Sequence, residues 1–391
     1  MQKIQNSSLL STPKNIYKNT PMYDLAIIGA GINGASMAFA FAEKKVILFD
    51  PEGIAHGGSG AAGAFIAPKF SKKGELKELL HDAFLFSMEY YEKNFPQFLT
   101  KALLLHIAQN EEDSLMLKEF KKQTALQVKT PPKELLDQLL PHAKVQENIC
   151  LDAGVVAARE ICKAMSKEAD FKKEKVQSLV YADGVWCINE TYFAKNVILA
   201  TGAYEAVLQE PYINLRGIWG HRIDIKTSTK NKYSIHQYLS ISPSKEGILA
   251  LGATHDVHYH PQKNIEPYDI HKGRAELLEK AAKTMLLEDI EIVQDYTGLR
   301  SGSVDYMPLA GGLVMSQETL ACKNINFENK KPNFEQYTYY PNLYVLNGSA
   351  GYGFVLAPYL AKILSEHILN ATEIDKKLLP ARFFARWARR R

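Results

Sequence analysis

The pattern of apolar and polar positions predicts a βαβ unit near the start of the chain. The segment from Tyr23 to Asp50 begins with an apolar run, passes through a glycine-rich turn into about ten Ala- and Phe-rich residues, and ends with a second apolar run. A strand that is apolar throughout is typical of a parallel sheet covered on both faces. We therefore expect a strand, a helix and a second, parallel strand that ends at Asp50.

The same order of strand and glycine turn returns twice. Residues 196–204 (NVILATGAY) read as a buried strand entering a glycine turn, and residues 342–369 repeat strand, glycine loop and helix. Between these stretches, residues 69–140 have a helical, polar composition, and residues 154–165 predict another helix. Residues 210–325 alternate β-type runs with one clear helix at 273–290.

These signals predict an α/β fold with a Rossmann-like nucleotide-binding domain built from discontinuous segments. We assign residues 23–75, 145–208 and 326–380 to that domain. The material between them, residues 76–144 and 209–325, predicts an α+β substrate domain with a mixed or antiparallel sheet. Residues 1–22 are expected to be a disordered extension, and residues 381–391 a basic tail.

Composition narrows the class of protein. The chain has 391 residues, 46% of them hydrophobic and 23% charged, which suits a globular enzyme of two domains and excludes collagen-like, coiled-coil and mainly disordered chains. The longest apolar runs, such as 25–28 and 197–200, are far shorter than the ~20 residues of a membrane span. The four cysteines show no metal-binding spacing, and no secretion signal is visible, so we expect a soluble, cytoplasmic protein without a metal site.

A GxGxxG turn carries the first functional signal. Gly29, Gly31 and Gly34 follow the predicted strand and open the predicted helix, where backbone amides can hold a pyrophosphate. Asp50 lies 21 residues after Gly29, where a carboxylate that binds ribose belongs, although it could instead cap the next turn. The motif predicts a dinucleotide, and by itself leaves NAD and FAD open.

Three further motifs distinguish these cofactors. The stretches Ser59–Gly63, Ile198–Ala203 and Gly348–Gly353, taken together, resemble the D-amino-acid oxidase and glycine oxidase family of FAD enzymes over nearly the whole chain after residue 22. The resemblance implies non-covalently bound FAD, with no covalent link at His56. The cofactor contacts that it implies are Gly29, Ala30, Gly31, Ile32, Asn33, Gly34, Asp50, Ser59, Gly60, Ala62, Gly63, Val176, Thr201, Gly202, Gly351, Tyr352 and Gly353.

Within that family, the chain looks most like the FAD domains of tRNA wobble-uridine modification enzymes. The likeness rests on residues 59–92, 216–221 and 252–254 and on the arginine-rich C-terminus. It implies oxidation of 5-carboxymethylaminomethyl uridine in tRNA to 5-aminomethyl uridine and glyoxylate. Such enzymes carry a methyltransferase domain in front, whereas only 22 residues precede the first motif here. Either a separate methyltransferase is a partner or the substrate differs.

Two other hypotheses stay open. A small-molecule oxidase or dehydrogenase of glycine, sarcosine or a D-amino acid would use the same chemistry, because each substrate carries an amine and a carboxylate on one carbon. A flavoprotein that only assists an assembly, without turnover, is the third hypothesis.

The resemblance also implies substrate residues. Arg300, within residues 297–305, matches an arginine that binds the substrate carboxylate, and a guanidinium suits that role because it pairs bidentately. The alternative is an ion pair of Arg300 with an acid such as Asp305. Tyr238 matches a tyrosine that holds the same carboxylate, and it could instead be ordinary aromatic core.

Other candidates are less specific. Tyr352 lies in the glycine loop before the last helix, where amides and the helix dipole can stabilise negative charge on a reduced flavin. Its ring could border the site or pack inward. His221, His255 and Trp219 could line the substrate cavity or serve the structure.

The C-terminus concentrates positive charge. Arg382, Arg386 and Arg389–Arg391 alternate with Phe383, Phe384 and Trp387, a pattern that can pair with RNA phosphates and stack on bases. A solvated basic tail, or attraction to an acidic membrane surface, would give the same pattern. With the resemblance, the arginines favour tRNA as partner and substrate.

Overall fold

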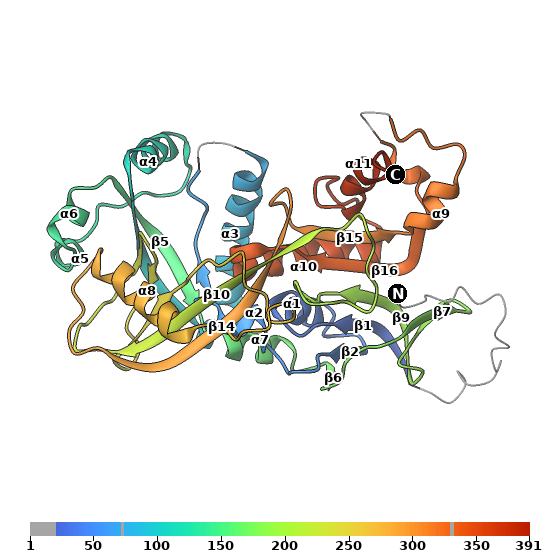
Figure 1. Ribbon diagram of the computed structural model, residues 1–391, viewed down its shortest axis with the longest axis horizontal. Coiled ribbons are helices and arrows are strands. Elements are labelled where there is room, and N and C mark those ends of the chain that lie inside the picture. Colours follow the sequence, from blue (N-terminus) through green and yellow to red (C-terminus); the bar gives the residue numbers. More distant parts are fainter. Residues whose placement is uncertain (1–20, 72–73, 329–331) are drawn as a thin grey trace.

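Two eight-stranded sheets organise the chain. The computed structural model describes residues 21–71, 74–328 and 332–391. Figure 1 shows the two sheets side by side, with α4, α6 and α8 on the left, α1 and α10 in the middle and α9 and α11 on the right. The expected disordered extension, apart from its last two residues, lies outside the described residues.

The first sheet is the predicted Rossmann-like sheet. Its strand order is β15-β16-β9-β1-β2-β6, in which β16, β9, β1, β2 and β6 run parallel and β15 is antiparallel to β16. A β7-β8 hairpin continues antiparallel from β9. The strands are β1 (Met22–Ile28), β2 (Val46–Phe49), β6 (Asp170–Lys172), β7 (Leu179–Ala182), β8 (Val185–Ile188), β9 (Tyr192–Leu199), β15 (Leu309–Val314) and β16 (Tyr339–Asn347).

The second sheet is mixed and mostly antiparallel. Its order is β14-β10-β13-β12-β11-β4-β5-β3, and only the β11-β4 pair is parallel. The strands are β3 (Phe65–Ile66), β4 (Leu99–Ile107), β5 (Asn148–Val156), β10 (Leu215–Lys226), β11 (Ser234–His236), β12 (Ser240–Ile241), β13 (Ile248–Gly252) and β14 (Glu291–Ser303). Together the two sheets confirm the predicted fold class.

Helices cover both sheets. Phe84 and Tyr91 are buried on α3, which packs with α1 and α10 in one core cluster over the first sheet. The principal helices are α1 (Ile32–Ala40), α2 (Gly58–Ala61), α3 (Glu75–Asn94), α4 (Glu111–Gln123), α5 (Lys133–Asp137), α6 (Pro141–Lys144), α7 (Ala158–Met165), α8 (Ile270–Ala282), α9 (Ser316–Ala321) and α10 (Gly353–Asn370). Within the described residues, no helix is both long and apolar enough to cross a membrane.

Two strands differ from the sequence expectation. β4 lies inside the stretch 69–140 that was expected to be helical, and residues 154–156 belong to β5 rather than to the helix predicted at 154–165. In both places the partner strand decides the outcome, because β4 and β5 pair with each other along their whole length. Three strands also pair across the expected domain segments: β3 and β5 join the second sheet and β15 joins the first.

The C-terminal residues are folded into the protein rather than free. A 3-10 helix, η5 (Pro380–Phe383), leads into α11 (Phe384–Ala388). The Phe384 side chain is fully buried, with its ring centroid 5.0 Å from that of Tyr337 and 5.5 Å from that of Trp387. The expectation of a basic tail is therefore wrong for Phe384, whose ring is part of a core cluster, while Phe383 and Trp387 are partly buried against the same cluster.

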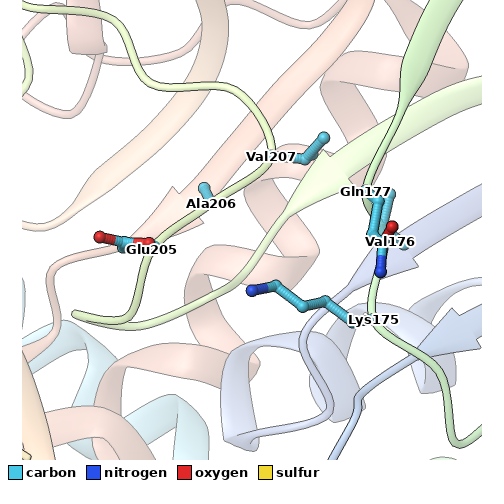
Figure 2. A pocket seen from close by; sticks show the side chains of 6 residues that line it. All are labelled: Lys175, Val176, Gln177, Glu205, Ala206 and Val207. Carbon is cyan, nitrogen blue, oxygen red and sulfur yellow. The ribbon is translucent and has the colours of Figure 1, made fainter. Parts of the chain in front are cut away.

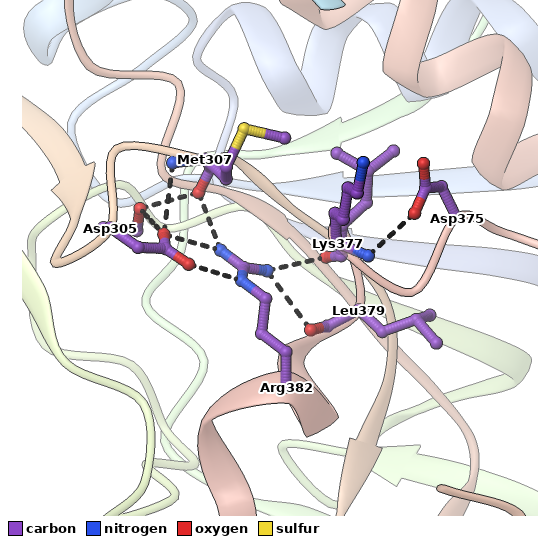
Figure 3. Close-up of polar contacts among 8 residues, drawn as sticks. Asp305, Met307, Asp375, Lys377, Leu379 and Arg382 are labelled. Carbon is purple, nitrogen blue, oxygen red and sulfur yellow. Dashed lines mark hydrogen bonds and ion pairs between the residues drawn. The ribbon is translucent and has the colours of Figure 1, made fainter. Parts of the chain in front are cut away.

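Arg382 links the C-terminal segment, residues 380–388, to the loop that follows β14. Its guanidinium donates to Asp305 (Nε to Oδ2, 2.8 Å; Nη2 to Oδ1, 3.0 Å) and to the carbonyl oxygens of Leu378 and Met307 (Figure 3). Burial acts to raise the pKa of Asp305, but the bonds and charge of Arg382 outweigh it and hold that pKa low. Arg382 is thus occupied within the fold.

Replacing Phe384 by Ala tests this packing. The variant is expected to lose about 3–5 kcal/mol of unfolding free energy, because it removes a large ring from a closed core. Urea unfolding of the flavin-loaded protein measures the loss. Arg390→Ala, at an exposed position of the same segment, should stay within about 0.5 kcal/mol of the parent. Equal stability of all three proteins would contradict a folded C-terminus.

Candidate active site

Four glycine-rich segments meet at the carboxyl edge of the first sheet. The backbone N–H of Ala200 donates to the carbonyl of Ile28 (2.8 Å), which joins the ends of β9 and β1. Asn347 Nδ2 donates to the carbonyl of Gly202 (2.9 Å), which joins the ends of β16 and β9. Ser59 Oγ accepts from the N–H of Ile32 (2.9 Å). The three motifs that suggested FAD are therefore neighbours in space.

The GxGxxG turn depends on close backbone contacts. Gly29 has φ +108°, and a Cβ on it would lie 2.4 Å from the carbonyl oxygen of Ala200. A Cβ on Gly34 would lie 1.9 Å from the carbonyl oxygen of Gly29. Because only hydrogen fits at both positions, the start of α1 is drawn tightly against the strand ends.

This arrangement fits a dinucleotide pyrophosphate. Gly31, the residue before α1, offers no side chain to cap the helix, so apart from the N–H taken by Ser59 the first amides have no side-chain acceptor. Helix N-termini of this kind favour anions because their free N–H groups and dipole point at the ligand.

The Asp50 carboxylate accepts hydrogen bonds from two different turns. Its Oδ2 accepts from the N–H of Ala30 (2.9 Å), and its Oδ1 accepts from the N–H groups of Glu52 and Gly53. The carboxylate therefore does cap the following turn, as the alternative reading held. A carboxylate has about four acceptor positions, so one remains for a ribose hydroxyl.

A hollow of about 260 Å³ lies at the same edge of the sheet. Figure 2 shows segments 175–177 and 205–207 on its two sides, and these segments follow β6 and β9 in the chain. Val176 is one of the lining residues. Ligands of parallel sheets bind outside the carboxyl ends of the strands, so this hollow suits the adenosine end of the cofactor. The residues present thus fit FAD.

The second sheet turns one face toward these cofactor segments. A Cβ on Gly58, at the start of α2, would lie 2.6 Å from the carbonyl oxygen of Leu299, and a Cβ on Gly298 would lie 2.7 Å from Gly58 Cα. Gly298 pairs with Gly220 of β10, so both residues belong to the face that α2 covers. We call this surface the cofactor-side face. The opposite face packs against α8.

Arg300 lies on the cofactor-side face without a counter-charge. Its Nη1 donates to the carbonyl of Thr254 (3.1 Å), and its guanidinium lies over Gly220, where a Cβ would come within 2.6 Å of Nη2. Burial lowers its pKa, and no carboxylate of the described residues forms an ion pair with it. The alternative partner Asp305 is bound by Arg382 instead. A buried cation left unpaired is suited to an anionic ligand.

Tyr352 is placed near Arg300 by the backbone. Gly302, two residues after Arg300, forms a bridge with Ser349 of the glycine loop that contains Tyr352. The ammonium of Lys69 lies 3.4 Å from the Tyr352 hydroxyl. Lys69 was not singled out in the sequence, although its place six residues after Gly63 puts it in the segment that follows α2.

His221 and Trp219 lie on the other side of the second sheet. His221 is fully buried, its Nε2 lies 2.9 Å from Asp295 Oδ1, and it packs against Gly273 of α8. Trp219 contacts the rings of Tyr259 and Tyr268 on the same side. Strand alternation explains this result, because odd-numbered residues of β10 face α8 and even-numbered ones face the cofactor segments. The structure does not bring these two candidates to Arg300.

His255 and Tyr238 have different surroundings. His255 is exposed, and its pKa is lowered by partial desolvation and then by the charge of Arg300, so it lies near the candidate site. Tyr238 lies in the turn between β11 and β12, and no described contact joins it to Arg300. In that stretch, Ser240 pairs with Gly252 and lies on the cofactor-side face. A count of strand alternation from Gly252 would have pointed to Ser240.

Together, these contacts fit an FAD-dependent oxidoreductase. Residues 24–367 match the profile of the family described as DAO, FAD dependent oxidoreductase, so the chain belongs to this family. FAD is its cofactor.

Several curated relatives are described as the same protein. The chain is 24% identical over 392 residues to the tRNA 5-methylaminomethyl-2-thiouridine biosynthesis bifunctional protein MnmC of Legionella pneumophila (strain Corby), with 91% of this chain and 56% of that protein covered. The protein with the same description in Leptospira interrogans (strain 56601) is 25% identical over 418 residues, with 96% and 63% covered. The chain thus spans little more than half the length of these relatives.

Solved structures show the same fold. Glycine oxidase from Geobacillus kaustophilus has a TM-score of 0.70 at 20% identity, with 91% of this chain and 96% of that chain covered. L-proline dehydrogenase from P. horikoshii has a TM-score of 0.71 at 15% identity, with 93% and 98% covered. At these identities the likeness concerns the fold.

Replacing Gly34 by Ala tests the cofactor cradle. The added Cβ cannot fit 1.9 Å from the Gly29 carbonyl, so the start of α1 must move and the FAD affinity should fall at least about tenfold, or 1.4 kcal/mol. Visible flavin absorbance per polypeptide after dialysis measures the loss. Gly302→Ala is the control, because its Cβ would meet only ordinary contacts at 3.6 and 4.0 Å. Full retention of FAD by the Gly34 variant would count against this placement.

Proposed function

We propose that this protein oxidises a secondary amine that bears a carboxylate, and that its substrate is 5-carboxymethylaminomethyl uridine at the wobble position of tRNA. The products are 5-aminomethyl uridine and glyoxylate. The observation that carries the proposal is the unpaired Arg300 guanidinium, which faces the cofactor segments from the second sheet.

In this proposal the protein has a simple task. Bound FAD supplies a two-electron acceptor for a hydride from the carbon between amine and carboxylate. Arg300 holds the carboxylate and thereby fixes which C–H bond faces the cofactor. The substrate loses a hydride from carbon and a proton from nitrogen, which is two electrons and two protons in total, and becomes an imine. Water then adds to the C=N bond and releases the amine and glyoxylate. A second acceptor must reoxidise the flavin.

The tRNA part of the proposal has two supports. The curated relatives are described as tRNA-modifying proteins. Arg386, Arg389, Arg390 and Arg391 are exposed on the first-sheet side of the molecule, where they can meet phosphates. The proposal places the reaction in the cytoplasm and makes a methyltransferase activity the next step, supplied by a partner protein or by another part of a longer chain.

The second candidate is an oxidase or dehydrogenase of a free small amino acid. The same Arg300 would hold the carboxylate of glycine, sarcosine or a D-amino acid, and the fold is that of a glycine oxidase. The third hypothesis, an assembly factor without turnover, gives no reason for an unpaired, partly buried guanidinium beside the cofactor segments.

Anaerobic flavin reduction separates these candidates. The purified protein is mixed with tRNA that carries the carboxymethylaminomethyl group, with the same tRNA lacking it, and with glycine, sarcosine and D-amino acids. We expect bleaching by the modified tRNA with release of glyoxylate. Bleaching by a free amino acid alone would favour the second candidate, and no bleaching at all would favour the third.

Arg300→Leu tests the carboxylate contact. The variant is expected to raise the substrate concentration for half-maximal flavin reduction roughly 100-fold or more, because it removes charge-assisted hydrogen bonds of roughly 1.5–3 kcal/mol each. For the Arg300→Lys variant, the substrate concentration for half-maximal flavin reduction should lie between those of the wild type and the Leu variant, because an ammonium keeps the charge but lacks the planar fork. FAD content is the control. Near-normal reduction in the Leu variant would remove Arg300 from the site.

Serine at Arg386, Arg390 and Arg391 tests the RNA surface without unfolding the segment. Each lost phosphate contact should weaken tRNA binding and reduce the slope of log K against log salt by roughly one. Lys118→Ser, at an exposed position on α4, is the matched control. Unchanged salt dependence in the triple variant would show that tRNA binds elsewhere or not at all.

A further inference from the structure

A row of aligned residues crosses the cofactor-side face. Strand register places one residue from each of six neighbouring strands, β14, β10, β13, β12, β11 and β4, side by side. Paired residues of neighbouring strands point to the same face. In order, the row is Tyr296, Arg222, Gly252, Ser240, His236 and His106. Five of its six residues carry polar side-chain atoms, whereas the face under α8 is lined by an apolar cluster.

The two histidines of this row lie against aromatic rings. The Phe65 ring meets His236 edge-on, with centroids 4.8 Å apart, and the Phe70 ring stacks on His106 with centroids 4.5 Å apart. Both phenylalanines belong to the segment that follows α2, as does Lys69 beside Tyr352. The histidine pair therefore lies between the second sheet and segments next to the cofactor.

Both histidines are neutral and incompletely bonded. Burial lowers the pKa of His106 to about 4, and burial together with His106 lowers that of His236 to about 3. His106 Nδ1 and His236 Nε2 are enclosed and have no hydrogen-bond partner among the described residues. An enclosed polar atom without a partner costs roughly 1–3 kcal/mol, so such atoms call for a ligand or water.

The pair lies on the same face of the second sheet as the proposed carboxylate site. The Arg300 guanidinium lies over β10 and reaches Thr254, which follows β13. β13, β12 and β11 follow β10 in the sheet, so His236 is about three strand spacings, or about 14 Å, from the strand under the guanidinium. A substrate held by its carboxylate at Arg300 would thus extend the group on its amine nitrogen toward His236, past Ser240.

We propose that His236 and His106, enclosed by Phe65 and Phe70, form a subsite for an uncharged planar heterocycle carried on the amine nitrogen of the substrate. A neutral imidazole donates one hydrogen bond and accepts one, which complements the alternating N–H and C=O groups on a uracil edge. The flanking phenyl rings favour a flat ring. This inference rests on the proposed function, because it takes the carboxylate position from Arg300.

Small N-substituted glycines test the subsite without tRNA. The rate of anaerobic flavin reduction is measured with N-(uracil-5-ylmethyl)glycine, N-benzylglycine and N-methylglycine. The wild-type protein should prefer the uracil compound to N-methylglycine. His236→Leu should lower the efficiency for the uracil compound about tenfold and leave that for N-methylglycine unchanged, whereas His236→Gln should recover part of the loss because an amide can donate and accept. His142→Leu, at an exposed position on α6, is the control.

Binding to the subsite can also be measured without turnover. Calorimetric titration with 5-methyluridine should show weaker binding to the flavin-loaded His236→Leu protein than to wild type, while FAD content and melting temperature confirm folding. Equal losses for the uracil compound and N-methylglycine, or equal binding of 5-methyluridine by both proteins, would overturn the subsite.

The two proposals fail in different ways. If the uracil compound is preferred but modified tRNA is inert, the subsite stands and the tRNA substrate falls. If modified tRNA reduces the flavin at the same rate in wild type and His236→Leu, the tRNA substrate stands and the subsite falls.

Discussion

The close approach of α2 to β14 is the contact on which the site depends. Gly58 and Gly298 let two backbones touch where any side chain would hold them apart. Helix α2 therefore contacts both parts of the molecule. Its Ser59 hydroxyl accepts a hydrogen bond from the first amide of α1, and its backbone packs against β14 of the second sheet. The distance between cofactor and substrate surfaces is therefore set by backbone atoms, which have fewer ways to adjust than side chains do. Such rigidity suits hydride transfer, which tolerates little misplacement.

Local patterns predicted the first sheet well. The βαβ unit, the strand at 196–199 and the C-terminal strand, loop and helix form where apolar runs and glycine turns indicated them, because these signals depend on residues close together in the chain. The strand β4 was missed, since its short apolar run sits in polar surroundings and becomes a strand by pairing with β5, more than 40 residues later. Non-local pairing of this kind leaves little trace in a local pattern.

The candidate site was predicted less completely, for a related reason. Arg300 was identified by its motif, but the histidine chosen on β10 faces α8, while Arg222 next to it faces the cofactor segments. Which of two adjacent residues points inward depends on register, and a shift of one residue exchanges the faces. Charge partners are equally non-local: Asp305 lies five residues from Arg300 but pairs with Arg382, 77 residues away.

The position of β16 has a consequence for biosynthesis. This strand comes from residues 339–347, yet it lies beside β9, and its loop supplies one wall of the cofactor site. The site is therefore incomplete until residues 339–353 have left the ribosome. Until then residues 197–199 of β9 have no partner on the β16 side, because β8 pairs only with residues 192–194, so the nascent protein exposes a short unpaired strand edge, which is a hazard for aggregation. FAD can therefore bind to the complete site only after this loop has been synthesised, and free FAD present at that moment favours the folded state by mass action.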